Sequence, residues 1–274
     1  MSLPPPVIRV ERTAWRDGLS SQGSRAIAEE CAIALTYDRV THAVMMATPS
    51  DLRDFAVGFS ITEGIVTEAG QIRQIDIVAA HGGIELRMDL AEDRRAALAR
   101  RHRRLAGPTG CGLCGLDSLA EALSPPPTVG AGPMVSAHAL RAALAEMAVL
   151  QTLNNETRAV HAAGFWQPGL GIRLVREDVG RHNALDKLAG ALAAGGLSAA
   201  GGALLLTSRV SVEMVQKAAR IGAPLIVAVS APTALALRTA EAAGITLLAV
   251  ARSDGFEIFT HPGRIFDEQH CHVA

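Results

Sequence analysis

Three short apolar runs near the C-terminal end constrain the fold of this 274-residue chain more than any other feature. They span residues 203–207, 225–230 and 246–251. The segments between them, 211–221 and 233–243, have a helical pattern, and each is followed by a glycine. Short continuous apolar runs bounded by turn residues are typical of strands that are buried on both faces. The alternation therefore predicts a strand–helix–strand–helix–strand unit, which is a parallel sheet covered by helices.

The rest of the chain carries pairs of strand-like segments separated by helix-like segments. Pro49-Ser50-Asp51 predicts the start of a helix with Ser50 as its N-cap, and that helix is expected to end near Gly64. The other predicted helices are 91–104, 116–123, 137–153 and 179–194, and the predicted strands are 32–38, 42–48, 72–79, 84–89, 160–166 and 170–176.

Proline and glycine mark the expected divisions of the chain. Pro125-Pro126-Pro127, followed closely by two glycines, predicts a connection that crosses the surface. The predicted divisions are a flexible N-terminal tail (1–27), an N-terminal α+β part (28–124), a Pro/Gly-rich connection (125–136), a C-terminal α/β part with a nucleotide crevice (137–266) and a tail (267–274).

Charge and composition exclude several classes of function. The net charge is −1 and the sequence pI is near 6.8, which gives no support for general nucleic-acid binding. No apolar stretch reaches membrane-spanning length without a charge or a breaker, and residues 1–6 lack the features of a signal peptide. Four cysteines, two of them far from the others, do not form a disulfide framework. We therefore expect a cytoplasmic protein with no nucleic acid and no membrane among its partners.

Cys111 and Cys114 are the candidate reactive groups. Glycines flank this pair on both sides and leave the sulfurs open to a large electrophile or a partner protein. The preceding stretch, Arg94 to Arg104, holds six arginines, and nearby positive charge favours the nucleophilic thiolate. The same arginines are either a solvated helix face or a docking surface.

The same cysteine pair has two other interpretations. A structural zinc site needs four ligands, so this pair would need two more, for which the candidates are His102, His161, His270, Cys271 and His272. The zinc deaminase pattern is missing, because glycine precedes Cys111 and no His-x-Glu lies upstream. A thioredoxin-like motif belongs at a strand end that opens a helix, whereas a basic helix and a loop precede this one. We expect no metal, and we interpret Cys31 as a buried small hydrophobe and Cys271 as an incidental thiol.

The carboxyl ends of the three apolar strands predict a binding crevice. Ligands of parallel sheets bind at these ends, and hydroxyls, helix N-termini and arginine suit phosphate groups. Neither a dinucleotide fingerprint nor a P-loop occurs in the sequence, and single hydroxyl residues here could equally be helix caps. The candidate cofactor-binding residues are Ser208, Arg209, Ser230, Thr233, Val250, Ala251, Arg252, Ser253, Asp254 and Gly255.

A second dense cluster of polar residues runs from Glu177 to Lys187. It combines acid, base, imidazole and amide groups just before an apolar helix, which favours a site and adds Arg181 and His182 to the candidate binding residues. The alternative is an N-cap at Asp178 followed by solvated ion pairs.

Taken together and in order, these motifs resemble the formate dehydrogenase accessory sulfurtransferase family, FdhD. The resemblance runs from about Ala28 to Arg264. It is carried by Phe55-Ala56-Val57-Gly58-Phe59, Glu63-Gly64-Ile65, the segments Thr109 to Gly115 and Glu177 to Lys187, Thr207-Ser208-Arg209, Ser211, Glu213, Met214, Val215, Lys217, Ser230-Ala231-Pro232-Thr233 and Thr260-His261-Pro262.

The resemblance implies a cytoplasmic sulfurtransferase with a cytidine-deaminase-like α/β fold. Such a protein accepts sulfur from a cysteine desulfurase as a persulfide on Cys111. It passes the sulfur to the molybdenum cofactor, in its bis-molybdopterin guanine dinucleotide form, before the cofactor enters formate dehydrogenase. The resemblance places cofactor binding at residues 250–255.

Two further expectations complete the sequence analysis. A dimer would offer two nucleotide crevices to the two guanine dinucleotide arms of the cofactor, so we expect a homodimer. The alternative function is a non-catalytic cofactor-binding chaperone whose cysteine pair senses redox state or binds a metal.

Overall fold

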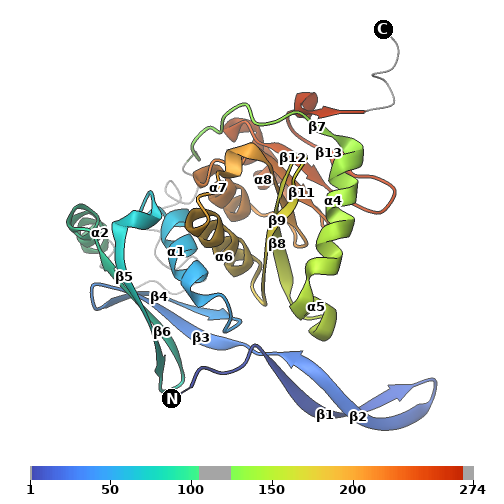
Figure 1. Ribbon diagram of the computed structural model, residues 1–274, viewed down its shortest axis with the longest axis horizontal. Coiled ribbons are helices and arrows are strands. Elements are labelled where there is room, and N and C mark those ends of the chain that lie inside the picture. The colour runs from blue at the N-terminus through green and yellow to red at the C-terminus, as the bar shows by residue number, and fades with distance from the viewer. Residues whose placement is uncertain (1, 105–124, 268–274) are drawn as a thin grey trace.

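The computed structural model describes residues 2–104 and 125–267, which form stacked layers of sheet and helix (Figure 1). An N-terminal sheet packs on helix α1 (Leu52–Thr62), and α1 packs on helix α6 (Arg181–Ala194). Helix α6 in turn covers one face of a six-stranded C-terminal sheet, whose other face is covered by α4 (Ala137–Leu150). Each half of the chain therefore contributes one sheet, and the two sheets meet through helices.

The N-terminal sheet has the strand order β4-β3-β6-β5. Its buried face carries Ile33, Leu35, Leu86 and Met88, which pack against the aromatic side of α1. The turn at Asp38-Arg39 has positive φ at both residues, as a two-residue hairpin requires. The elements are β3 (Cys31–Tyr37), β4 (Val40–Ala47), η1 (Ala69–Gln71), β5 (Ile72–Ala80), β6 (Gly83–Leu90) and α2 (Glu92–Arg104).

The C-terminal sheet confirms the predicted strand–helix–strand–helix–strand unit. Strands β10 (Ala203–Leu206), β11 (Leu225–Ala228) and β12 (Thr246–Ala249) are parallel neighbours in the order β13-β12-β11-β10-β8-β9. Because side chains alternate across a strand, Leu204 and Leu206 pack under α6, α7 (Val212–Arg220) and α8 (Ala234–Ala243), whereas Leu205 packs under α4. The flanking strands are β8 (His161–Gln167), β9 (Gly171–Asp178) and β13 (Glu257–Ile258), and η2 (Ala199–Gly201) precedes β10.

The connection from 125 to 134 leads into β7 (Val135–Ser136), which pairs in parallel with β14 (Ile265–Phe266) after η3 (Pro262–Arg264). The single helix predicted over 137–153 is wrong, because the chain breaks at Gln151 and a second helix, α5 (Thr152–Thr157), begins. The break has a local cause. The carboxylate of Glu177 accepts hydrogen bonds from the backbone N–H groups of Leu153 (2.9 Å) and Asn154 (2.7 Å) and so starts a new helix.

Two predictions at the N-terminal side need correction. The sequence predicts a flexible tail over residues 1–27, but β1 (Val7–Arg16) and β2 (Leu19–Ala28) form a long hairpin that leaves the body of the molecule (Figure 1). The two strands satisfy each other's backbone N–H and C=O groups and bury few apolar side chains. The amino-acid composition of residues 1–27 therefore does not reveal the hairpin. The N-cap of α1 is Asp51 and not Ser50, because the N–H of Ser50 turns back to the carbonyl of Thr48 and delays the helix.

No helix within residues 2–104 and 125–267 is long and apolar enough to cross a membrane. The mixed α/β class is as expected, and the finer assignment as a cytidine-deaminase-like fold stays a prediction.

Helices α1 and α6 cross at two glycines, Gly58 and Gly190. A Cβ on Gly58 would lie 1.6 Å from the carbonyl oxygen of Asp186, and one on Gly190 would lie 1.9 Å from the carbonyl oxygen of Asp54. The backbones therefore touch directly, so any larger residue would separate the two halves of the molecule.

We expect Gly58→Ala to lower the free energy of unfolding by more than about 3 kcal/mol, although alanine favours a helix, because the two backbones cannot separate without losing contacts along the crossing. Urea denaturation followed by circular dichroism measures the change. Gly70→Ala is the control, since a Cβ there meets no atom within 4 Å. Equal stability of Gly58→Ala and wild type would contradict the close crossing.

Candidate functional site

One edge of the C-terminal sheet gathers most of the predicted binding residues. The carboxyl ends of β10, β11 and β12 lie there side by side, and the antiparallel register brings in the start of β8 and the end of β9. His161, the first residue of β8, pairs with Asp178, the last of β9. The helices α6, α7 and α8 all begin at this edge, so their positive N-terminal ends are directed to the same region. We call it the crevice edge.

The loops at the crevice edge are tied to one another by backbone hydrogen bonds. The N–H of Val229 donates to Leu206 (2.9 Å), and the N–H of Val250 donates to Ser230 (3.3 Å). Ser208 is buried and Arg209 is exposed. Thr233 caps α8, since its hydroxyl accepts from the N–H of Ala236 (3.2 Å). The capping interpretation is therefore correct for Thr233.

The loop 250–255 is held in a tight turn after β12. Val250 has a φ of 53°, a left-handed conformation that is costly for a β-branched residue and often occurs at binding sites. Arg252 fixes the turn through its N–H to the carbonyl of Gly255 (2.7 Å). Its guanidinium also bridges the carbonyls of Val229 (2.6 Å) and Ala251 (2.8 Å), so it joins this loop to the one after β11.

Asp178, just before α6, and Lys187, within α6, form a fully buried ion pair. The two charged groups are 2.7 Å apart, and both side chains are 0% exposed. Asp178 also accepts from the N–H groups of Thr48 (3.0 Å) and Gly180 (2.7 Å), and Lys187 donates to the carbonyl of Thr48 (2.9 Å). The pair therefore holds the end of β4 against α6. The alternative interpretation, an N-cap at Asp178, is wrong, because the cap is Gly180 and Asp178 is used for this pair.

A second buried pair joins α1, α6 and α7. The ammonium of Lys217 lies 2.8 Å from Asp186 and 2.7 Å from Glu63, and it also contacts the hydroxyl of Thr62 (3.0 Å). Burial raises the pKa of Asp186. Desolvation opposes the charge of Lys217, but the carboxylates of Asp186 and Glu63 outweigh it and raise the pKa of this lysine. The ion pairs of Asp186 and Lys187 are therefore buried, and not solvated as the alternative interpretation requires.

Arg181 and His182 lie in the first turn of α6 and are half-buried. The Nε of Arg181 and the Nε2 of His182 are buried and make no hydrogen bond within the described part of the chain. Burial, together with the charges of Arg181 and Lys217, lowers the pKa of His182 to about 4, so its imidazole is neutral at pH 7. Burial and Arg181 also lower the pKa of His161. Two neutral imidazoles and a nearby guanidinium therefore belong to residues at the crevice edge.

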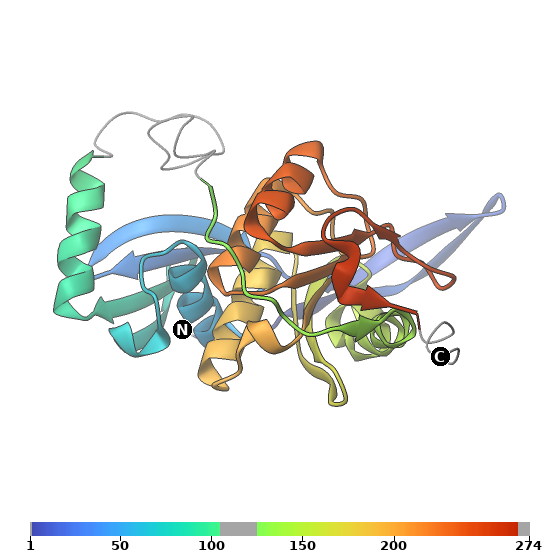
Figure 2. The ribbon, with the colours of Figure 1, turned by 90° about the horizontal axis from the view of Figure 1, so that it is seen from above.

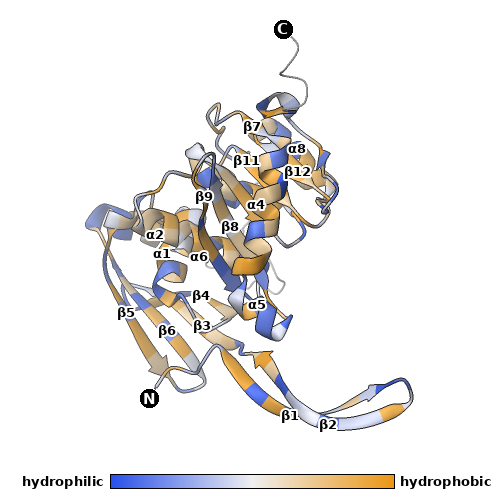
Figure 3. Cartoon of the chain, turned by 45° about the vertical axis from the view of Figure 1, so that its right-hand side comes forward, coloured by the Kyte–Doolittle hydropathy of each residue, from blue (hydrophilic) through white to orange (hydrophobic). Residues whose placement is uncertain are grey.

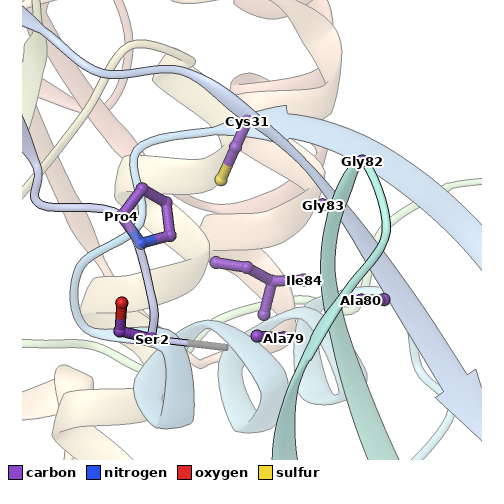
Figure 4. A pocket seen from close by; sticks show the side chains of 8 residues that line it. All are labelled: Ser2, Pro4, Cys31, Ala79, Ala80, Gly82, Gly83 and Ile84. Atoms are coloured by element: carbon purple, nitrogen blue, oxygen red, sulfur yellow. The ribbon is translucent and has the colours of Figure 1, made fainter.

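Cys31 lies beside a cavity of about 200 Å³ between the N-terminal segment and the first sheet (Figure 4). Pro4 and Ile84 are among the residues that line this cavity. Burial and the nearby Glu29 raise the pKa of the Cys31 thiol, which is 3.7 Å from the carbonyl oxygen of Ala47. Such a thiol is not activated. The residue is only half-buried, so its interpretation as a buried hydrophobe is wrong in that respect.

The predicted reactive pair, Cys111 and Cys114, lies outside the described residues, as do His270, Cys271 and His272. Among the described side chains, no three His, Cys, Asp or Glu residues are arranged to hold a metal ion. In α2, Arg95 pairs with Asp38 at 2.9 Å, so this arginine stabilises the N-terminal part.

The sequence model of the FdhD/NarQ family matches residues 28–266. The chain belongs to the FdhD/NarQ family. Proteins named sulfur carrier protein FdhD are similar to it over nearly their whole length: that of Agrobacterium fabrum is 52% identical, covering 94% of this chain and 95% of the relative. That of Cupriavidus necator is 46% identical, covering 93% and 88%.

A solved structure has the same fold. The crystal structure of a protein assigned as a formate dehydrogenase accessory protein, from Desulfotalea psychrophila, aligns with a TM-score of 0.73 and 26% identity. The alignment covers 96% of this chain and all of that one. The layered arrangement of this chain is therefore shared with a solved structure.

Two residues that matter for this FdhD/NarQ chain were missed by sequence reasoning. Thr48 and Thr62 contact the buried pairs, yet their partners lie 130 and 124 positions away. No local pattern marks such contacts. The polar cluster from Glu177 to Lys187 was found, but four of its members, Glu177, Asp178, Asp186 and Lys187, hold the fold together.

We expect Lys187→Met to lower the free energy of unfolding by about 3–5 kcal/mol, because it leaves Asp178 buried without its partner charge. The matched control is Arg87→Met, which breaks a 2.7 Å surface pair with Glu85 and is expected to change stability far less, because water screens an exposed guanidinium. Urea titrations of both variants measure the difference. Equal decreases in the free energy of unfolding would show that the buried pair contributes no more to stability than the surface pair does.

The low pKa of His182 predicts a pH dependence of stability. Between pH 6.5 and about 4 the unfolded chain binds a proton at this residue that the folded chain excludes, so stability falls as the pH falls through this window. We expect His182→Gln to remove that loss, which is about 3 kcal/mol for this change in pKa. Thermal unfolding from pH 7 to 4 tests it, with the exposed His138→Gln as control. Parallel curves for wild type and His182→Gln would refute the assignment.

Proposed function

We propose that this chain is a sulfurtransferase that carries sulfur as a persulfide on Cys111. It receives the sulfur from a cysteine desulfurase and passes it to the molybdenum cofactor, in its bis-molybdopterin guanine dinucleotide form, before insertion into formate dehydrogenase. One observation carries the proposal: relatives named sulfur carrier protein FdhD match 94% of a chain that holds the glycine-flanked cysteine pair.

The loading step is a thiolate–persulfide exchange. The Cys111 thiolate attacks the terminal sulfur of the desulfurase persulfide. A new sulfur–sulfur bond forms at Cys111, the bond in the desulfurase breaks, and the desulfurase cysteine leaves as a thiolate. The arginine-rich stretch before the pair favours the thiolate form of Cys111.

Release of the sulfur has two possible routes that involve Cys114. In the first, the Cys114 thiolate attacks Cys111, a Cys111–Cys114 disulfide forms, and the outer sulfur leaves at the oxidation level of sulfide. In the second, Cys114 only stabilises the persulfide, and an acceptor takes the sulfur directly. Only the first route leaves the protein two electrons more oxidised after each transfer.

The crevice edge suits the anionic, nucleotide-bearing cofactor as a bound substrate. Three helix N-termini and the exposed Arg209 and Arg252 supply positive charge for phosphate groups. The buried nitrogens of Arg181 and His182 supply unused polar contacts. Ser208, Ser230 and the backbone of residues 250–255 complete the proposed site, whereas the hydroxyl of Thr233 is already used in capping α8.

The other parts of the proposal concern the setting. The protein acts in the cytoplasm as a homodimer without a resident metal, and its partners are a cysteine desulfurase and formate dehydrogenase. A dimer offers two crevice edges to the two guanine dinucleotide arms of one cofactor.

Incubation with a cysteine desulfurase and cysteine, followed by intact mass measurement, tests the proposal. We expect wild type and Cys114→Ala to gain the mass of one sulfur and Cys111→Ala to gain none, because Cys111 accepts the sulfur. Guanosine diphosphate binding is the control and should be unchanged in Cys111→Ala. Unmodified wild type that binds the nucleotide would favour the cofactor-binding chaperone instead.

A further inference from the structure

The hairpin β1–β2, residues 7–28, extends from the body as an arm. Its register is unbroken from Val7 opposite Ala28 to Arg16 opposite Leu19. It lies at the opposite end of the molecule from α2 (Figure 2). Of residues 11–22, all except Ala14 are exposed. An isolated two-stranded ribbon is only marginally stable in water, so an arm of this length needs a surface to cover it.

The tip of the arm exposes two large apolar side chains. Trp15 is 74% exposed and Leu19 is 75% exposed. Trp15 lies opposite Ser20 and Leu19 lies opposite Arg16, so the pleat directs the two side chains to opposite faces of the ribbon. Figure 3 shows apolar and polar residues alternating along the arm. Tryptophan is the residue type most enriched among the anchors of protein interfaces.

Charge indicates what the arm binds. It carries four arginines against Glu11 and Asp17, a net charge of +2, and since the whole chain carries −1, the remainder carries −3. At the base of the arm, two arginines already bind polar groups on the body. Arg9 lies 3.6 Å from Glu156, and Arg25 donates to the carbonyl of Thr157 (3.4 Å), both on α5. The body of the same protein is therefore an electrostatically suitable surface for an arm.

A complementary apolar surface lies beside the base of the arm. Val149 is 75% exposed and Leu150 is 44% exposed at the end of α4, directly before α5. If two copies place their arms antiparallel across a two-fold axis, the tip of each arm reaches the base of the other. Ten residues make an arm about 33 Å long, and two strands make it about 10 Å wide. One face of both arms with the surfaces they cover comes to roughly 1,300 Å², within the range of specific interfaces.

We propose that the arm clasps a second copy of this chain, with Trp15 anchored against the Val149 and Leu150 surface of the partner. The contact is isologous, so each copy both gives and receives an arm. The inference rests on the proposed homodimer and assigns its contact surface. It is independent of the cysteine pair. The arm also precedes residue 28, where the match to the family begins.

Sedimentation equilibrium of the full chain tests the clasp. Wild type should be a dimer, and the tip variant Trp15→Ser should dissociate with a dissociation constant at least about thirtyfold higher. Val149→Ser should weaken the dimer in the same direction. Met134→Ser removes another exposed apolar side chain, 58% exposed, and should leave the dimer unchanged. A monomeric wild type, or a tip variant that dimerises as wild type does, would overturn the proposal.

Tryptophan fluorescence gives a second readout. The chain has two tryptophans, and Trp166 is only 5% exposed, so Trp166→Phe leaves Trp15 as the sole reporter. In the dimer, Trp15 should be shielded from iodide, and dilution should expose it. Quenching that is independent of concentration would contradict the clasp. Sulfur loading of the same variants by intact mass separates the two proposals, because a tip variant should still load Cys111 as a monomer.

Discussion

Two buried lysine–carboxylate pairs and one crossing of glycines join the halves of this protein. The pairs of Lys187 with Asp178 and of Lys217 with Asp186 lie beside the contact of α1 with α6. Phe55 and Phe59 of α1 lie under the two ammonium groups, with ring centroids 5.9 Å and 5.5 Å from the nitrogens. Charges buried this deeply are stable only when fully paired, so the site depends on the halves staying in contact.

The positions of the residues at the crevice edge depend on this contact between the two halves. Asp178 ends β9 and Arg181 begins α6, so the buried pair fixes the backbone from which Arg181 and His182 project. The left-handed Val250 and the bridging Arg252 fix the opposite side of the same edge. The polar groups at this edge are therefore already positioned, so the proposed binding of the cofactor would need little ordering.

The sequence predicted those parts of the structure that depend on local pattern. The parallel unit was predicted correctly, because buried strands and glycine-ended helices have a distinct periodicity. The arm was not, because exposed strands rich in Arg and Ser resemble a flexible tail. The cluster from Glu177 to Lys187 was recognised, but a charge that faces a ligand and a charge buried against Thr48 look the same in a sequence. The cysteine pair can be identified only from the sequence, since its residues lie outside the described part of the structure.

The separation of the paired residues along the chain has a consequence for biosynthesis. Thr48 meets Asp178 across 130 positions, and Lys217 meets Thr62 across 155. When the first sheet and α1 leave the ribosome, the helix that covers them has not been made. Until then, Gly58 and the aromatic side chains of α1 are exposed to water. Contacts between positions so far apart in the sequence also form slowly. Nascent chains of this protein are exposed to aggregation until α7 has emerged.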